Sequence, residues 1–130
     1  MLRTECILTP RQELEKDVRI SVMSRHTLSD GVTQDTRITS DLFDEHVPEL
    51  APPLELVGDY YKRGMSWEEY ADRYNSYLRT IGGVVLRLAQ RSCEGDITLL
   101  CIEHSPEHCH RRLLAERCKE LIPNLEIEIN

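Results

Sequence analysis

The sequence predicts an α/β fold, with a small, mostly parallel sheet of about four strands and helices on its faces. Residues 97–102 (ITLLCI) are almost continuously apolar, as strands buried on both faces are. A helical pattern follows from residue 105 to about residue 121, and residues 125–129 (LEIEI) then alternate strictly. Strand, helix and strand in this order predict a C-terminal βαβ unit with a right-handed crossover. The length fits one domain, residues 1–130.

Two more strands are expected nearer the N-terminus. Residues 5–8 form a short apolar run closed by Thr9 and Pro10, and residues 18–24 (VRISVMS) are rich in strand-forming side chains. We interpret the second run as a central strand. The charged stretch between them, residues 11–16, predicts a turn or a short helix.

A long loop is expected over residues 25–40, where turn residues are frequent and periodicity is weak. Loops of this length are uncommon in compact domains and often carry function. A short helix is expected to follow over residues 41–47, with Ser40 or Asp41 as its N-cap.

Three helices are expected in the middle of the chain. Pro53 begins the first and Gly64 ends it. Ser66 and Glu69 form a capping box at the start of the second. A glycine pair then separates it from a third helix over residues 84–93.

The last predicted helix follows the strand at residues 97–102. Ser105 is its expected N-cap and Pro106 its first residue, and Pro123 ends it. A helical wheel places His110 on the stripe that faces the sheet.

Charge and hydropathy exclude several classes of partner. The formal net charge is −7, so the surface as a whole does not attract nucleic acid or anionic lipid. The apolar runs are far shorter than the roughly 20 residues that span a bilayer. The N-terminus lacks the apolar core of a signal peptide, and we therefore expect a cytoplasmic protein.

The five cysteines are an odd number without disulfide-scaffold or CxxC spacing, which predicts free thiols. Zinc needs about four Cys or His ligands in tetrahedral reach. Cys101, His104, His108 and Cys109 offer four such side chains, but they span a strand end and a turn. We expect no resident metal ion and no cofactor, although a metal-stabilised fold remains an alternative.

Soft and titratable side chains concentrate in one segment. Residues 98–118 contain three of the five cysteines and three of the five histidines. This segment includes the carboxyl end of the strongest strand and the start of the following helix, where parallel sheets bind ligands and helix dipoles favour anions. If the strand at residues 18–24 is parallel to it, Arg25 emerges beside Glu103.

Two arginines and three other side chains there could do chemistry. Cys109 near a helix start fits a reactive thiol, or a buried packing residue. His110 fits a general acid or base, or a buried histidine that binds a loop carbonyl. Arg25 and Arg111 could clamp a carboxylate or phosphate, or pair with Glu103.

The same residues resemble a known family. A strand ending Leu-Cys-x-Glu, followed by Pro-Glu-x-Cys-His-Arg and a leucine-rich helix, resembles the signature of domain of unknown function 488, in its short single-domain branch. The matching residues are Leu100, Cys101, Glu103, Pro106, Glu107, Cys109, His110 and Arg111. The resemblance extends from about Val18 onward. It implies a compact cytoplasmic α/β domain in which Ser24, Arg25, Glu103 and residues 109–111 share one site, and it implies no particular activity.

Our first hypothesis is an enzyme, or a pocket, for a small anionic molecule such as a nucleotide, another phosphate compound or a nucleic-acid fragment. In it, Cys109, His110 and Glu103 are the catalytic residues. The ligand-binding residues are Ser24, Arg25, Ser105 and Arg111. The alternative is a non-catalytic binding or adaptor module that uses the same pocket, or the aromatic helices, for a partner.

Overall fold

The computed structural model describes residues 1–130 and confirms the α/β class. Its five strands form one sheet in the order β3-β2-β4-β1-β5, and every neighbouring pair is parallel. The strands are β1 (Leu2–Cys6), β2 (Val18–Ser21), β3 (Glu45–His46), β4 (Ile97–Cys101) and β5 (Ile127–Glu128). The helices are α1 (Leu54–Lys62), α2 (Trp67–Thr80), α3 (Gly82–Glu94) and α4 (His110–Leu121), with a 3-10 turn, η1 (Pro48–Leu50).

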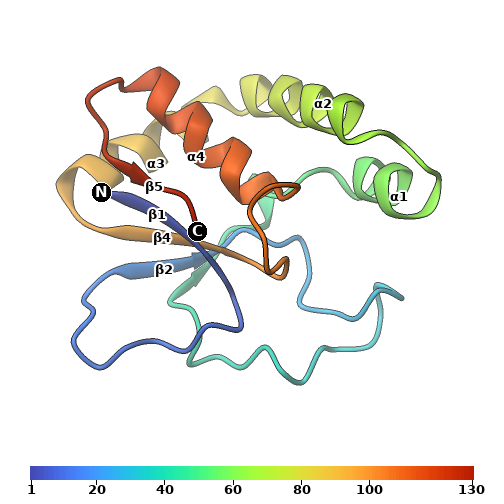
Figure 1. Ribbon diagram of the computed structural model, residues 1–130, viewed down its shortest axis with the longest axis horizontal. Coiled ribbons are helices and arrows are strands. Elements are labelled where there is room, and N and C mark those ends of the chain that lie inside the picture. Colours follow the sequence, from blue (N-terminus) through green and yellow to red (C-terminus); the bar gives the residue numbers. More distant parts are fainter.

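The most apolar strand lies at the centre of the sheet. All five residues of β4 are buried, and β2 and β1 pair with it on either side. Helices α2, α3 and α4 pack together above one face, whereas irregular segments pass below the other (Figure 1). A second, smaller hydrophobic cluster joins these segments to the sheet, and it includes Ile38, Leu42 and Leu100.

Three of the predicted helix boundaries are confirmed in atomic detail. Helix α1 begins directly after Pro53 and ends before Gly64, which has a positive φ of 75°. Helix α2 has Ser66 as N-cap, and its hydroxyl accepts a hydrogen bond from the backbone N–H of Glu69. None of the helices has the length and the hydropathy needed to cross a membrane.

Residues 41–47 form no helix, contrary to the prediction. Turns lead into the two-residue strand β3, which extends the sheet beside β2. Asp44 shows why, since its carboxylate accepts a hydrogen bond from the backbone N–H of Arg19 and its own N–H donates to the Arg19 carbonyl. The segment is therefore bound to the sheet edge and does not form its own helical bonds.

The first and last predicted elements also differ in their bounds. Strand β1 begins at Leu2, earlier than expected, and its polar Thr4 is buried where it bonds the main chain of Asn130. Strand β5 pairs with β1 and not with β4, so the crossover through α4 passes over β1. The C-terminal βαβ unit is parallel, but its two strands are not neighbours.

Helix α4 begins at His110, four residues later than Pro106, and Cys109 is its N-cap. The hydroxyl of Ser105 accepts from the backbone N–H of Glu107, which forms a local turn and not a helix cap. This displacement matters for the site, because it leaves a loop between the end of β4 and the start of α4.

Candidate functional site

A cavity of about 900 Å³ lies beyond the carboxyl ends of β2 and β4. Three parts of the chain form most of its lining: the loop at residues 23–37, helix α1 with residues 51–52 that follow η1, and the junction of β4 with α4. Tyr70 of α2 completes it. The lining residues are Met23, Ser24, Arg25, Thr27, Leu28, Ser29, Asp30, Gly31, Asp35, Arg37, Ala51, Pro52, Leu54, Val57, Gly58, Tyr61, Lys62, Tyr70, Cys101, Ile102, Glu103 and His110. The long loop predicted over residues 25–40 is thus one wall of the cavity.

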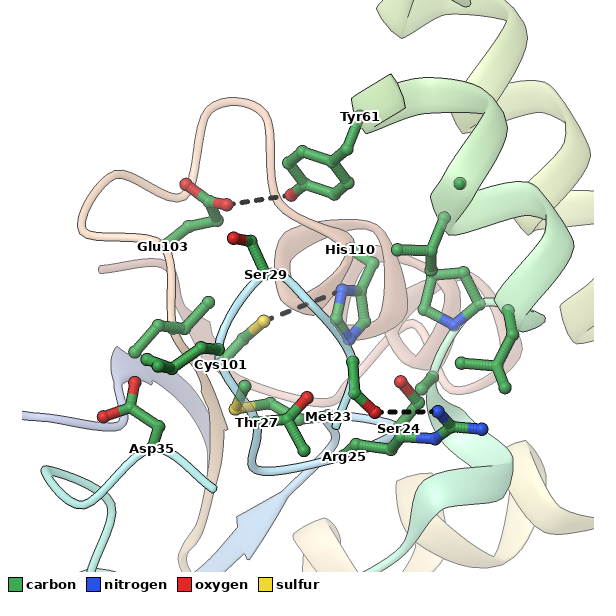
Figure 2. Close-up of a pocket in the computed structure, with 18 of the residues that line it drawn as sticks. Met23, Ser24, Arg25, Thr27, Ser29, Asp35, Tyr61, Cys101, Glu103 and His110 are labelled. Carbon is green, nitrogen blue, oxygen red and sulfur yellow. Dashed lines mark hydrogen bonds between the residues drawn. The ribbon is translucent and has the colours of Figure 1, made fainter. Parts of the chain in front are cut away.

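His110 lies at the floor of this cavity with its ring fixed. It is only 7% exposed, and its Nε2 lies 2.8 Å from the carbonyl oxygen of Val22. A carbonyl only accepts, so Nε2 carries the ring proton when the imidazole is neutral. The other nitrogen, Nδ1, then presents a lone pair and lies 3.8 Å from the sulfur of Cys101 (Figure 2).

Cys101, the last residue of β4, faces His110 across the cavity floor. The pKa of its thiol is lowered, chiefly because the thiol of Cys109 donates a hydrogen bond to its sulfur. The two backbone N–H groups that follow Cys101 and the guanidinium of Arg111 act in the same direction, whereas burial opposes them. Its surroundings therefore favour a thiolate, as those of reactive cysteines do.

Cys109, the predicted nucleophile, does not line the cavity. It is 2% exposed and its pKa is raised, because its thiol is the donor in the hydrogen bond to Cys101 and because it is buried. The lowered pKa that we expected at the helix start is found at the other cysteine. The imidazole of His110 lies near both sulfurs, but of the two cysteines Cys101 alone lines the cavity.

Arg111 is also turned away from the cavity. Its side chain is fully buried, and its five N–H groups are all used. They donate to the main-chain oxygens of Glu103 (2.5 Å), His104 (3.3 Å) and Asn130 (3.1 and 3.2 Å) and to the sulfur of Cys109 (3.5 Å). The guanidinium therefore holds the loop before α4 in place and has no free donor for the predicted anion.

Glu103 lines the cavity but does not pair with an arginine as expected. Its carboxylate accepts a hydrogen bond of 2.8 Å from the hydroxyl of Tyr61 on α1 (Figure 2). Burial and this carboxylate raise the pKa of Tyr61, so the phenol keeps its proton. The pair joins α1 to the end of β4 at the rim of the cavity.

The rim carries cations without carboxylate partners. Arg25 is exposed and donates to the carbonyl oxygen of Gly31 at 3.0 Å, and neither it nor Lys62 forms a salt bridge. In contrast, Arg37 forms a bidentate pair with Asp35. Arg25, Glu103 and His110, which we expected to lie together, all line this cavity.

The outcome for the seven predicted site residues is mixed. Four line the cavity: Ser24, Arg25, Glu103 and His110. Three do not: Ser105, Cys109 and Arg111. Sequence reasoning considered Cys101 as a metal ligand and not as a nucleophile, although its position at the end of the strongest strand was a usable signal. It missed Tyr61, which arrives from a distant helix and gave no signal.

Potential metal ligands are grouped differently from the quartet considered in the sequence. His108 stacks on Trp67, with ring centroids 4.9 Å apart, and the Nδ1 of His104 lies 3.8 Å from the sulfur of Cys6. The ligand atoms of Cys101, Cys109 and His110 lie within 4.8 Å of one another, and all three residues are buried.

Comparison with known proteins identifies one family. The family model DUF488-N3a, described as "Active DUF488-N3 subclade", matches residues 2–121. The searches of curated proteins and of solved structures gave no match.

Proposed function

The chain belongs to the DUF488-N3a family and is thus a member of DUF488, the family that its sequence resembles, and from the geometry of its cavity we propose that it is a thiol-dependent enzyme. The substrate is a small anionic molecule. One observation carries the proposal: the sulfur of Cys101 and the Nδ1 of His110 face each other, 3.8 Å apart, at the floor of a cavity. A thiol beside an oriented imidazole is the arrangement that activates a cysteine nucleophile.

In the proposed reaction, His110 accepts the thiol proton at Nδ1 while the sulfur of Cys101 attacks an electrophilic carbonyl carbon or phosphorus atom. A bond from sulfur to that atom forms, and the bond to the leaving group breaks. The proton on Nδ1 passes to the leaving group. Water then attacks the covalent intermediate, gives a proton to Nδ1 and regenerates the thiol.

The bond from His110 to Val22 supports this role in two ways. It fixes the ring in the tautomer whose Nδ1 is a base. It also stabilises the imidazolium formed during the reaction, because both ring nitrogens then carry protons and Nε2 keeps its acceptor. The sequence left two roles open for His110, a buried histidine that binds a loop carbonyl and a general base. In this proposal it has both roles.

The charges of the cavity support an anionic substrate. The carboxylate of Asp35 pairs with Arg37, and that of Asp30 accepts from the backbone of its own loop. Arg25 forms no salt bridge at the rim, where it can bind a phosphate or carboxylate. Lys62 lies close enough to Asp30 to help lower the pKa of that carboxyl, and it adds a second positive charge to the rim.

Apolar residues also line the cavity, which narrows the chemical class of the substrate further. They are Ala51, Pro52, Leu54 and Val57. A ligand that combines an anionic group with an apolar or ring portion matches this lining. The acidic chain as a whole repels polyanions, so we expect a small molecule and not a nucleic-acid strand.

The direct test is modification of Cys101 in metal-free, chelator-treated protein that carries Cys93→Ser, since Cys93 is exposed. Mass spectrometry after brief iodoacetamide treatment should find Cys101 modified before Cys109. The rate should fall about tenfold or more in His110→Gln, because the base is lost. An aromatic phosphate ester or thioester that binds the cleft should slow the modification, and Arg25→Glu should remove that protection.

Equal modification rates with and without His110 would contradict the activated thiol. An unreactive Cys101 in a protein that still binds such compounds through Arg25 would instead support the non-catalytic binding module. The proposal requires reduced thiols, and a reducing compartment such as the cytoplasm supplies that condition.

A further inference from the structure

We propose that Cys101, Cys109 and His110 form a binding site for one zinc ion, with the fourth coordination position open to the cavity. Their ligand atoms lie within 4.8 Å of one another, and the Cys101 sulfur is 3.8 Å from the Nδ1 of His110. In tetrahedral zinc sites, with Zn–S of about 2.3 Å and Zn–N of about 2.0 Å, sulfur and nitrogen ligands lie roughly 3.6 Å apart. Small rotations of the two thiols are enough to reach this geometry.

The histidine is already oriented as a zinc ligand. Metal-binding imidazoles commonly donate their second N–H to a carbonyl or carboxylate, which fixes the tautomer. The Nε2 of His110 lies 2.8 Å from the carbonyl oxygen of Val22, so the free lone pair on Nδ1 points at the two sulfurs. No rearrangement of the ring is needed.

The surroundings also suit two thiolates. Arg111 is fully buried without a carboxylate partner, and its Nη1 donates to the sulfur of Cys109 at 3.5 Å. A buried guanidinium beside sulfur stabilises negative charge there, and N–H groups directed at ligating sulfurs are part of the outer shell of thiolate sites. The two ligating thiolates would balance the charge of the bound zinc ion.

The position of the cavity decides what kind of site this is. Cys101 and His110 line it, whereas Cys109 lies behind them. A zinc ion among the three would therefore have its fourth position toward the cavity, and three protein ligands with one open position are typical of catalytic or exchangeable zinc. Zinc on Cys101 uses the same lone pair as nucleophilic attack, so the metal-bound and thiol-active states exclude each other.

This inference goes beyond the proposed function, and its test does not depend on that function. Protein treated with chelator is titrated with Co²⁺, which reports thiolate ligands by charge-transfer absorption and tetrahedral geometry by intense visible bands. We expect one equivalent to bind and Zn²⁺ to displace it. Cys101→Ser and Cys109→Ser should each weaken binding more than about 100-fold.

The matched control is Cys6→Ser. Cys6 also lies 3.8 Å from a histidine nitrogen, but it has no second thiol in ligating reach. Binding should be unchanged in this variant. Equal loss in Cys6→Ser, or a cobalt spectrum without thiolate charge transfer, would overturn the site.

A measurement on the wild-type chain keeps the test independent of folding of the variants. One equivalent of Zn²⁺ should protect both Cys101 and Cys109 from alkylation under mildly denaturing conditions, and Cys93 should stay reactive. Absence of protection overturns the metal site. The thiol proposal is tested separately, because its assay uses metal-free protein. Cys101 should be modified quickly there, whatever the result of the zinc titration.

Discussion

Two thiol–imidazole pairs lie at the carboxyl ends of neighbouring strands. Cys6 ends β1 and lies 3.8 Å from the Nδ1 of His104; Cys101 ends β4 and lies 3.8 Å from the Nδ1 of His110. The two cysteines are partners in the sheet register. By residue type and distance alone, the pairs are equivalent.

Their surroundings differ in every other respect. His104 is exposed, whereas His110 is buried and held by the Val22 carbonyl. The second pair lies within hydrogen-bonding reach of Cys109 and lines the cavity. The first pair has no such second thiol and does not line the cavity. The comparison teaches that a short distance between sulfur and nitrogen is common wherever strands end together. Enclosure, a fixed tautomer and a second thiol separate a candidate site from a chance contact.

The largest effect is expected from removing the guanidinium of Arg111, which donates to the sulfur of Cys109 beside the second pair. Arg111→Met should lower the free energy of unfolding by about 4 kcal/mol, because the main-chain oxygens that the guanidinium binds lose their donors in a buried place. Urea unfolding followed by circular dichroism measures this.

Arg117 on the same helix is the control for that variant. It is half-buried and forms a surface pair with Glu120, so Arg117→Met should cost less than about 1 kcal/mol. Similar costs for the two arginines would show that Arg111 does not hold the loop, and a stable Arg111→Met protein would restore it as a candidate for binding anions.

A smaller effect is expected from truncating the two histidines. His110→Ala should cost about 2–3 kcal/mol, since the Val22 carbonyl loses its partner and the ring loses its packing against Tyr74. His104→Ala should cost less than about 0.5 kcal/mol, because the side chain is exposed. Thermal unfolding of both variants compares the pairs directly, and equal costs would remove the distinction drawn above.

Much of the scaffold was predictable because its signals are local. The buried run of β4, the capping box of α2 and the proline at the start of α1 depend on neighbours within a few residues. Strand β3 was missed because two residues carry no periodicity, and its pairing with β2 depends on a contact between Asp44 and Arg19.

The site was predictable in place but not in detail. The junction of β4 with α4 was expected to hold the site, and Arg25 and His110 both line the cavity there, although α4 begins four residues later than predicted. The roles of Cys109 and Arg111 depended on the true start of α4 and on the main chain of Asn130, which lies 19 residues further along the chain. Helix-wheel reasoning started from Pro106 and could not anticipate that the loop would turn the guanidinium inward.

The smallest effect expected is in acid, and it comes from a third imidazole outside both pairs. His26 bonds the hydroxyl of Ser21 at 2.7 Å and stacks on His46, with centroids 4.3 Å apart. Burial lowers its pKa, and the nearby His46 adds to this. As the pH falls, the unfolded chain therefore takes up the proton before the folded one does. The stability that neutral His26 contributes is complete above the unfolded pKa of about 6.5. It is lost as the pH falls from there toward the lowered pKa of the folded state.

The urea concentration at the midpoint of unfolding should therefore be lower at pH 5 than at pH 7.5, and His26→Gln should reduce that difference. His104→Gln, which changes the exposed member of the first pair, should leave the difference intact; the reverse pattern would assign the acid response to the Cys6 pair and weaken its status as a chance contact.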